Sequence, residues 1–129
     1  MIQPTPTDEK PYLDDHFERY IVCDTETTGF YPEKGDKMVE FCFYEIDRYG
    51  NPVDNLHSLI NPERPIPQVV VNIHGIDNRK VANAPTWKQF HPRMTEFLNK
   101  RGLPKDKQCL IIHNAPFDVG FIETQMRIE

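Results

Sequence analysis

Two carboxylates, Asp24 and Glu26, directly follow a short apolar run at residues 20–23 in the sequence YIVCDTETTG. In an extended strand residues i and i+2 face the same way, so both carboxylates are expected on one side and Thr25 on the other. Neighbouring anions repel each other unless a cation compensates them, and hard oxygen ligands suit Mg²⁺ or Mn²⁺. The pattern therefore predicts a divalent metal site at the end of a strand. A solvated acidic strand end would have the same sequence.

A calcium-binding EF-hand loop is excluded by the same stretch. Four residues match positions 1, 3, 5 and 6 of the loop pattern: Asp24, Glu26, Thr28 and Gly29. Position 12 is Gly35, where the loop requires a bidentate glutamate, and the flanking segments are strand-like rather than helical. The stretch is instead predicted to be a turn after a strand, in which Gly29 supplies conformational freedom.

A third carboxylate, Asp118, lies in the stretch HNAPFDVGF at residues 113–121. Asn114 can cap a helix that begins at residues 115–116, because proline is tolerated in a first helical turn. Asp118 then falls near the helix start, where the helix dipole stabilises an ionised carboxylate. If the strands at 20–24 and 109–113 are neighbours, Asp118 approaches the first two carboxylates. Dipole stabilisation alone would also explain an aspartate at this position.

The elements that must position these residues follow from apolar periodicity and turn residues. Strands are predicted at residues 20–24, 38–47, 56–60 and 109–113, with a hairpin turn at 48–52. A short helix is predicted at 68–73, and a longer one follows Thr86-x-x-Gln89, which has the form of a capping box. Its apolar residues recur at helical spacing: Trp87, Phe90, Met94, Phe97 and Leu98. Pro92 is expected to disturb its first turns, and Gly102 to end it.

Together these elements predict one α/β domain, a mixed sheet flanked by helices. Residues 1–18 carry several prolines and acidic side chains and are predicted to be a flexible polar leader, so the domain proper would occupy 19–129. At 129 residues the chain is long enough to bury a substantial core. No internal repeat or low-complexity block interrupts it.

Composition narrows the function classes. The formal net charge of −5 argues against a protein that holds nucleic acid through a general basic surface. The three cysteines, Cys23, Cys42 and Cys109, lie far apart in apolar runs and are predicted to be buried hydrophobes rather than a disulfide framework or zinc site. The polar N-terminus lacks a signal core, and no apolar span approaches about 20 residues, so a cytoplasmic protein without membrane contact is expected.

Three stretches together resemble the DEDD 3′-5′ exonuclease superfamily, especially its DnaQ-like branch, which includes the proofreading epsilon subunit of DNA polymerase III. They are DTETTG at 24–29, HGI at 74–76 and HNAPFD at 113–118, and the intervening INPERPIP is also similar. The resemblance extends from about residue 20 to the end of the chain. It implies a ribonuclease H-like fold, in which an antiparallel meander of three strands is followed by a parallel strand.

The resemblance also implies two Mg²⁺ or Mn²⁺ ions as cofactors. Asp24, Glu26 and Asp118 would be both the catalytic residues and the metal ligands. Asp24 would be shared between the ions, Glu26 would hold the ion on the side of the nucleophile, and Asp118 would support the second. Two ions that bridge a phosphate can activate a water and stabilise the departing 3′ oxygen.

A pocket for the terminal nucleotide is implied around five further residues: Thr25, Thr27, His74, Asn114 and Phe117. Each of the last three has a structural alternative. His74 could be a loop histidine bonded to the backbone, Asn114 a helix cap, and Phe117 a core residue. Glu40 matches a position where the family often has glutamate and is expected to be structural.

The third motif of the family is expected downstream of Asp118. It contains a general-base histidine or tyrosine and a final metal-binding aspartate, and the sequence reaches Glu129 without it. The last residues, FIETQMRIE, contain no helix stop, so the domain is expected to be C-terminally incomplete. His74 and His113 are not assigned as substitutes for the base. An apolar sheet edge is expected to favour self-association or docking.

The leading hypothesis is a metal-dependent 3′-5′ exonuclease that releases nucleoside monophosphates from single-stranded or frayed ends of DNA or RNA. Polymerase proofreading, with a polymerase subunit as partner, would suit an acidic enzyme that grips only a terminus. The alternative is a catalytically inactive module that binds nucleic acid or a partner and retains the exonuclease fold. A structural domain with a coincidental acidic strand is the third hypothesis.

Overall fold

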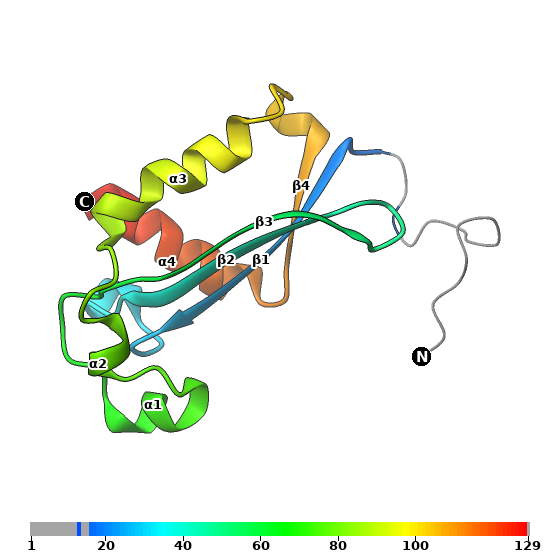
Figure 1. The fold of residues 1–129 in the computed structure, drawn as a ribbon. Coiled ribbons are helices and arrows are strands. Elements are labelled where there is room, and N and C mark those ends of the chain that lie inside the picture. Colours follow the sequence, from blue (N-terminus) through cyan, green and yellow to red (C-terminus); the bar gives the residue numbers. More distant parts are fainter. Residues whose placement is uncertain (1–12, 14–15, 129) are drawn as a thin grey trace, which may run out of the picture.

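Four strands form one mixed sheet in the order β3-β2-β1-β4 (Figure 1). The computed structural model describes Leu13 and residues 16–128. An antiparallel meander consists of β1 (Arg19–Thr27), β2 (Met38–Ile46) and β3 (Pro52–Leu59). Strand β4 (Gln108–Ile112) pairs with β1 in parallel. The predicted mixed sheet is therefore confirmed, including the neighbouring positions of the first and fourth strands.

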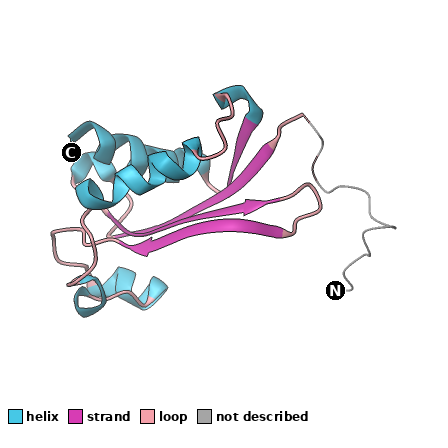
Figure 2. Cartoon of the chain, turned by 45° about the horizontal axis from the view of Figure 1, so that its top comes forward, coloured by secondary structure: helices cyan, strands magenta, loops and turns pink. Residues whose placement is uncertain are grey.

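Helices lie on both sides of this sheet. They are α1 (Gln68–His74), α2 (Asn78–Val81), α3 (Trp87–Asn99) and α4 (Ala115–Ile128). Helices α3 and α4 cover one face, whereas α1 and α2 lie at the other side near one end of the strands (Figure 2). Two short 3-10 helices, Pro32–Lys34 and Lys105–Lys107, precede β2 and β4. No helix in the described part of the chain combines the length and apolar character needed to span a membrane.

The main core fills the space between the sheet and helices α3 and α4. Its aromatic members pack ring to ring, with Phe41 lying 4.7 Å from Phe43, 5.8 Å from Trp87 and 5.4 Å from Phe90 between centroids. Phe121 of α4 is fully buried in the same cluster. A smaller cluster on the other side joins α1 and α2 to the sheet: Val39, Ile66, Val70, Ile76 and Val81.

Local sequence explains where α3 begins. The Thr86 hydroxyl accepts from the Gln89 amide at 3.3 Å, and the Gln89 side chain accepts from the Thr86 amide at 3.0 Å. This is the predicted capping box. The helix continues through Pro92, and Gly102 adopts a left-handed conformation with φ 63° soon after it ends.

Some boundaries differ from the sequence prediction. Strand β3 begins at Pro52 rather than at residue 56, because its pairing with β2 extends a segment that has no continuous apolar run. Strand β1 continues to Thr27, and the four-residue helix α2 was not predicted; the Asp77 side chain caps it by accepting from the Lys80 amide at 3.0 Å. A bulge leaves Val39 as an extra residue in β2, since Glu26 pairs with Glu40 but Thr27 pairs with Met38.

A buried arginine, Arg19, connects several elements at the end of the sheet opposite the acidic residues. Arg19 is 2% exposed, and its Nε donates to Glu45 Oε1 at 2.9 Å. Its Nη1 donates to the Phe97 carbonyl at 2.7 Å and to Gln108 Oε1 at 2.9 Å. The guanidinium thus joins β1, β2, the last turn of α3 and β4.

Other sequence predictions have mixed outcomes. Cys23 and Cys42 are buried as predicted, whereas Cys109 is only partly buried, and all three thiols are free. Within the described residues β4 is an edge strand, on which Leu110 is 44% exposed, so the expected apolar edge is present while self-association stays a prediction. Most of the predicted leader at 1–18 lies outside the described residues.

Candidate active site

The carboxyl end of β1 presents alternating polar side chains. Asp24 is exposed, Thr25 is buried and Glu26 is half-buried, which is the alternation expected of a strand with one covered face. Asp24 and Glu26 therefore share the face opposite α3 and α4. Thr25 points toward the helices.

Asp118 lies beside this strand end because β4 runs parallel to β1. Val22 pairs with Ile111 and Cys23 with Ile112, so the turn after β4 delivers the start of α4 next to the last residues of β1. Asp118 is 6% exposed in the first turns of α4. The hydroxyl of Thr25 donates a short hydrogen bond to Asp118 Oδ1. Asp118 is thus held on the helix side of β1.

The three carboxylates influence one another electrostatically. Burial raises the pKa of the Asp118 carboxyl; the hydrogen bond from Thr25 opposes this shift and the charge of Asp24 adds to it. Burial also raises the pKa of Glu26, again with a contribution from Asp24. Among the residues that the structure describes, no lysine or arginine forms an ion pair with any of the three. In the part of the chain that is described, the strand end therefore has negative charge that no lysine or arginine ion pair compensates.

The donor chemistry of this site suits a hard divalent cation, since carboxylate oxygens are the ligands that Mg²⁺ and Mn²⁺ prefer. Asp24 and Glu26 are available on the open face of β1. Within Leu13 and residues 16–128, however, no three His, Cys, Asp or Glu side chains are gathered as metal ligands. The alternation that unites Asp24 and Glu26 separates them from the Thr25 side chain that holds Asp118. A metal-binding role for all three carboxylates stays a prediction.

A pocket of about 170 Å³ opens beside Glu26. Four segments of the chain form its walls: the end of β1, the turn after it, helix α1 and the start of α4. The lining residues are Thr25, Glu26, Thr27, Gly29, Phe30, Val70, Ile73, His74 and Phe117. The walls are mainly apolar or aromatic, which suits a flat ring, and the Glu26 carboxylate at one side suits a cation.

His74 lies in this pocket with both ring nitrogens engaged. Its Nδ1 accepts from the Ile76 amide at 3.0 Å, and its Nε2 is 3.0 Å from the Thr27 carbonyl. Because a carbonyl only accepts, the proton is on Nε2 and the ring is the neutral Nε2-H tautomer. Both expected features of His74, backbone bonding and a pocket position, are therefore present. No ring nitrogen is free to remove a proton from water.

Phe117 contacts the core and the pocket together. Its ring centroid is 4.9 Å from that of Phe121 in the core and 6.3 Å from that of Phe30 across the pocket. Thr27 donates from its hydroxyl to the Gly29 carbonyl at 2.6 Å, which closes the turn after β1.

Asn114, in contrast, is exposed and does not line the pocket. Its carbonyl accepts from the amides of Phe117 at 3.0 Å and Asp118 at 3.2 Å, at the beginning of α4. His113 is exposed beside it. Glu40, expected to be structural, pairs with His57 at 2.6 Å between Oε2 and Nε2.

Three pocket residues were not identified from the sequence: Phe30, Val70 and Ile73. Phe30 directly follows the Gly29 turn, and an aromatic residue in a turn after two carboxylates is a usable signal for a contact with a ring. Val70 and Ile73 lie three residues apart in a helix too short to bury both of them. Ile73 is 69% exposed, which fits a surface that meets a ligand.

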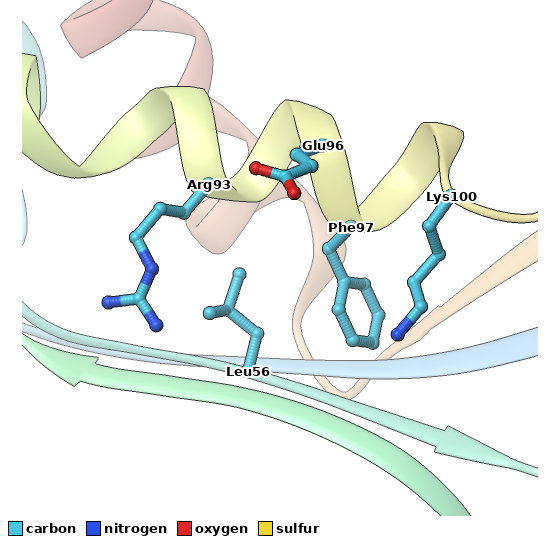
Figure 3. A pocket seen from close by; sticks show the side chains of 5 residues that line it. All are labelled: Leu56, Arg93, Glu96, Phe97 and Lys100. Carbon is cyan, nitrogen blue, oxygen red and sulfur yellow. The ribbon is translucent and has the colours of Figure 1, made fainter.

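A separate hollow lies between α3 and β3 (Figure 3). Leu56 and Phe97 form its floor, and Arg93, Glu96 and Lys100 surround it. The ammonium of Lys100 is already paired with Asp54, and charges of both signs line the rim. This hollow contains none of the predicted site residues, so the chemistry is assigned to the end of β1.

The amino-acid sequence of this chain is similar to those of known proteins. The model of the Exonuclease family, RNase_T, matches residues 21–128. The DNA polymerase III subunit epsilon of Rickettsia conorii is 34% identical over 110 residues, which cover 85% of this chain and 45% of that protein. The 3′-5′ exonuclease DinG of Bacillus subtilis is 29% identical over 109 residues, which cover 84% of this chain and 11% of that protein.

Solved structures support the same fold. The nuclease domain of 3′hExo, a DEDDh family member bound to rAMP, superposes with a TM-score of 0.76 at 20% identity and covers 89% of this chain and 61% of that chain. This likeness confirms the predicted ribonuclease H-like exonuclease fold. The chain spans less than half the length of the epsilon subunits that it matches, 45% in the R. conorii protein.

Proposed function

This chain belongs to the exonuclease family, and from that premise we propose that it hydrolyses terminal phosphodiester bonds at 3′ ends of DNA or RNA. The products would be nucleoside monophosphates. The observation that carries this proposal is the pocket at the end of β1, in which aromatic and apolar walls meet the half-buried carboxylate of Glu26. A terminal nucleotide has a flat base that suits the apolar and aromatic walls, and its phosphodiester would meet the Glu26 carboxylate through a bound divalent cation.

Asp24, Glu26 and Asp118 are the proposed catalytic residues, with Mg²⁺ or Mn²⁺ as cofactor and two ions in the complete site. A bound pair of such ions would supply Lewis-acid activation of water and charge stabilisation at the departing 3′ oxygen. The uncompensated charge at the strand end supports this assignment, because adjacent carboxylates favour cation binding. Thr25 would orient Asp118 through its hydrogen bond.

Thr25, Thr27, His74 and Phe117 are the proposed contacts of the terminal nucleotide, with Phe30 added to them by the pocket geometry. Asn114 is proposed to contact the substrate from the start of α4, outside the pocket walls. His74 would contribute as a neutral, fixed ring rather than as a base, because both nitrogens are bonded to backbone. The groups that this chain supplies therefore bind and orient the substrate.

Single-stranded or frayed ends are the proposed substrates, since a pocket of about 170 Å³ has room for the end of a strand rather than for a duplex. A DNA polymerase subunit is the proposed partner, because the R. conorii relative is named as a subunit of DNA polymerase III. The net charge of −5 agrees with a protein that gains little affinity from phosphate neutralisation along a strand.

The decisive experiment incubates the chain with Mn²⁺ and a single-stranded oligonucleotide labelled at its 5′ end. Stepwise shortening from the 3′ end is expected for the native chain and is expected to disappear in Asp24→Ala. Glu96→Gln is the matched control, because Glu96 is an exposed carboxylate on α3 outside the pocket. A folded chain that gains thermal stability with Mn²⁺ but never shortens the strand would instead support an inactive binding module.

A further inference from the structure

The turn between β1 and β2 is built around one carboxylate, Asp36. The Thr28 hydroxyl donates to Asp36 Oδ1 at 2.9 Å, and the Tyr31 amide donates to Oδ2 at 3.2 Å. Gly29 packs directly on the same carboxylate, since a Cβ at position 29 would lie 2.6 Å from Asp36 Cγ. A larger residue at position 29 would displace the Asp36 carboxylate, so Gly29 and Asp36 together determine the path of the chain that leads into Phe30.

Arg64 connects this turn to a second segment, the one between β3 and α1. Its Nη1 lies 3.5 Å from Asp36 Oδ1 and also donates to the Gly35 carbonyl. The segment is itself held in a tight conformation: Glu63 has a left-handed φ of 56°, and its amide donates to Asn61 Oδ1 at 2.9 Å. A non-glycine residue in that conformation requires support from its surroundings.

The two connected segments contribute two different walls of the pocket. The turn after β1 supplies Gly29 and Phe30, and the segment that contains Arg64 leads directly into α1, which supplies Val70, Ile73 and His74. Among the described residues, Asp36 and Arg64 themselves do not line the pocket. Their ion pair therefore lies outside the pocket and connects the two segments that form these walls.

We infer that Asp36 and Arg64 are positioning residues that set the spacing of the two walls of the terminal-nucleotide pocket. This inference rests on the proposed function and extends it to residues outside the pocket. The Arg64 side chain is 37% exposed and that of Asp36 is 16% exposed, so their ion pair contributes little to folding. Its removal should affect nucleotide binding more than the stability of the domain.

Arg64→Ala is the test variant, and Lys34→Ala is its matched control. Lys34 lies in the turn that contains Asp36, and its replacement removes the same charge. Its ammonium stacks over the Tyr31 ring at 4.9 Å, and among the described residues it forms no hydrogen bond or ion pair with the segment that contains Arg64. AMP, titrated into each protein and followed by calorimetry, is the probe for the pocket. Arg64→Ala is expected to weaken AMP binding about 3- to 10-fold, since a small misplacement of binding groups has effects of this size or larger. Lys34→Ala is expected to bind AMP as the native chain does.

Three further measurements separate positioning from a general structural role. Arg64→Ala should raise KM for the oligonucleotide more than it lowers kcat, while its melting temperature stays within about 2 °C of native. Arg64→Lys should recover part of the affinity. Asp36→Asn combined with Arg64→Ala should weaken AMP binding by less than the product of the single effects, because both changes break one connection.

Hydrogen exchange of the backbone amides tests the inference without a measurement of activity. In Arg64→Ala, amides of the Asp36 turn and of α1 should exchange faster together, which the Lys34→Ala control should not show. Equal AMP affinity in Arg64→Ala and the native chain, or an equal loss in Lys34→Ala, would overturn the inference. If the native chain neither binds AMP nor shortens a strand, the proposed function fails. If hydrogen exchange in Arg64→Ala is also unchanged, the inference that Asp36 and Arg64 hold the two segments together fails as well.

Discussion

The hydroxyl of Thr25 donates a hydrogen bond to Asp118 Oδ1 and so joins β1 to α4 through two buried side chains. The two residues are 93 positions apart in the chain, and the parallel pairing of β1 with β4 brings them together. A buried carboxylate needs such a donor, because an unsatisfied acceptor in the interior is costly. The same bond fixes where the Asp118 charge lies relative to Asp24.

Thr25→Val should therefore destabilise the domain and lower its activity. Valine fills the same volume but removes the hydroxyl that donates to Asp118, which is expected to cost about 1–3 kcal/mol in the free energy of unfolding. Urea unfolding measures this loss. Thr25→Ser keeps the hydroxyl and should retain most of the Mn²⁺-dependent strand shortening. Equal activity in the valine and serine variants would show that the hydrogen bond does not position Asp118.

Much of the fold could be predicted because it is encoded locally. Alternating apolar residues identified the strands, the Thr86–Gln89 capping box identified the start of α3, and the turn at residues 48–52 identified the hairpin. Strand β3 was underestimated at its beginning, where Val53 and Asn55 are exposed and the extended conformation comes from pairing with β2. The contacts of Arg19 could not be predicted from the sequence, since only the tertiary structure surrounds its guanidinium with acceptors.

The positions of the candidate site residues in the fold were predictable from the sequence, but the geometry of the candidate site was less so. Strand alternation correctly placed Asp24 and Glu26 together, and helix position correctly placed Asp118 in the first turns of α4. The hydrogen bond between Thr25 and Asp118 could not be read from either pattern, because it depends on the rotation of α4 against the sheet. The pocket walls formed by Phe30 and Ile73 likewise depend on loops whose paths are set by distant contacts.

Glu26→Gln should stabilise the domain at neutral pH. A carboxyl group whose pKa is higher in the folded chain than in the unfolded chain makes folding less favourable once it ionises. The pKa of Glu26 is raised by burial and by Asp24, so its contribution to stability should fall as the pH rises from the ordinary glutamate value of about 4.3 through the raised value. Above that range the advantage of Glu26→Gln should be constant, and below it the advantage should vanish.

Asp47→Asn is the control for this pH series, because the pKa of Asp47 is lowered in the folded chain whereas that of Glu26 is raised. Hydrogen bonds from Asn51 lower the pKa of Asp47, with the Asn51 amide 2.9 Å from Oδ1. Its contribution to stability is present at neutral pH and is lost as the pH falls, so Asp47→Asn should be less stable than native at pH 7 but not at low pH. Thermal unfolding between about pH 3 and pH 8 covers both transitions. Parallel curves for the native chain and Glu26→Gln would contradict the raised pKa.

Mn²⁺ should raise the melting temperature of the native chain. A ligand at about 100 times its dissociation constant adds about 2.7 kcal/mol, which corresponds to several degrees for a domain of this size. Asp24→Asn should reduce the rise, and a chelator should reverse it. The rise should also shrink near pH 4, since protonated carboxyl groups bind the ion poorly. An identical rise in Asp24→Asn and the native chain would exclude Asp24 as a ligand.

Arg19→Met should be the most destabilising of these changes while leaving the pocket intact. Methionine fills part of the volume, but Glu45 loses the Arg19 Nε donor at 2.9 Å, and the Phe97 carbonyl and Gln108 lose theirs. Removal of one partner from a buried ion pair typically costs about 3–5 kcal/mol, and the exposed Arg101, 3.2 Å from Glu45 Oε1, offsets only part of this loss. Urea unfolding would measure the loss, and AMP binding would show that the other end of β1 is unaffected.

The matched control for this change is Arg101→Met. Arg101 also reaches Glu45, at 3.2 Å from Oε1, but its side chain is 41% exposed, so its loss should cost no more than about 1 kcal/mol. Glu45→Gln in the Arg19→Met background should recover part of the stability, since it removes a buried charge whose remaining ion-pair partner is the exposed Arg101. A loss in Arg19→Met no larger than that in Arg101→Met would mean that the buried guanidinium does not hold this end of the sheet together.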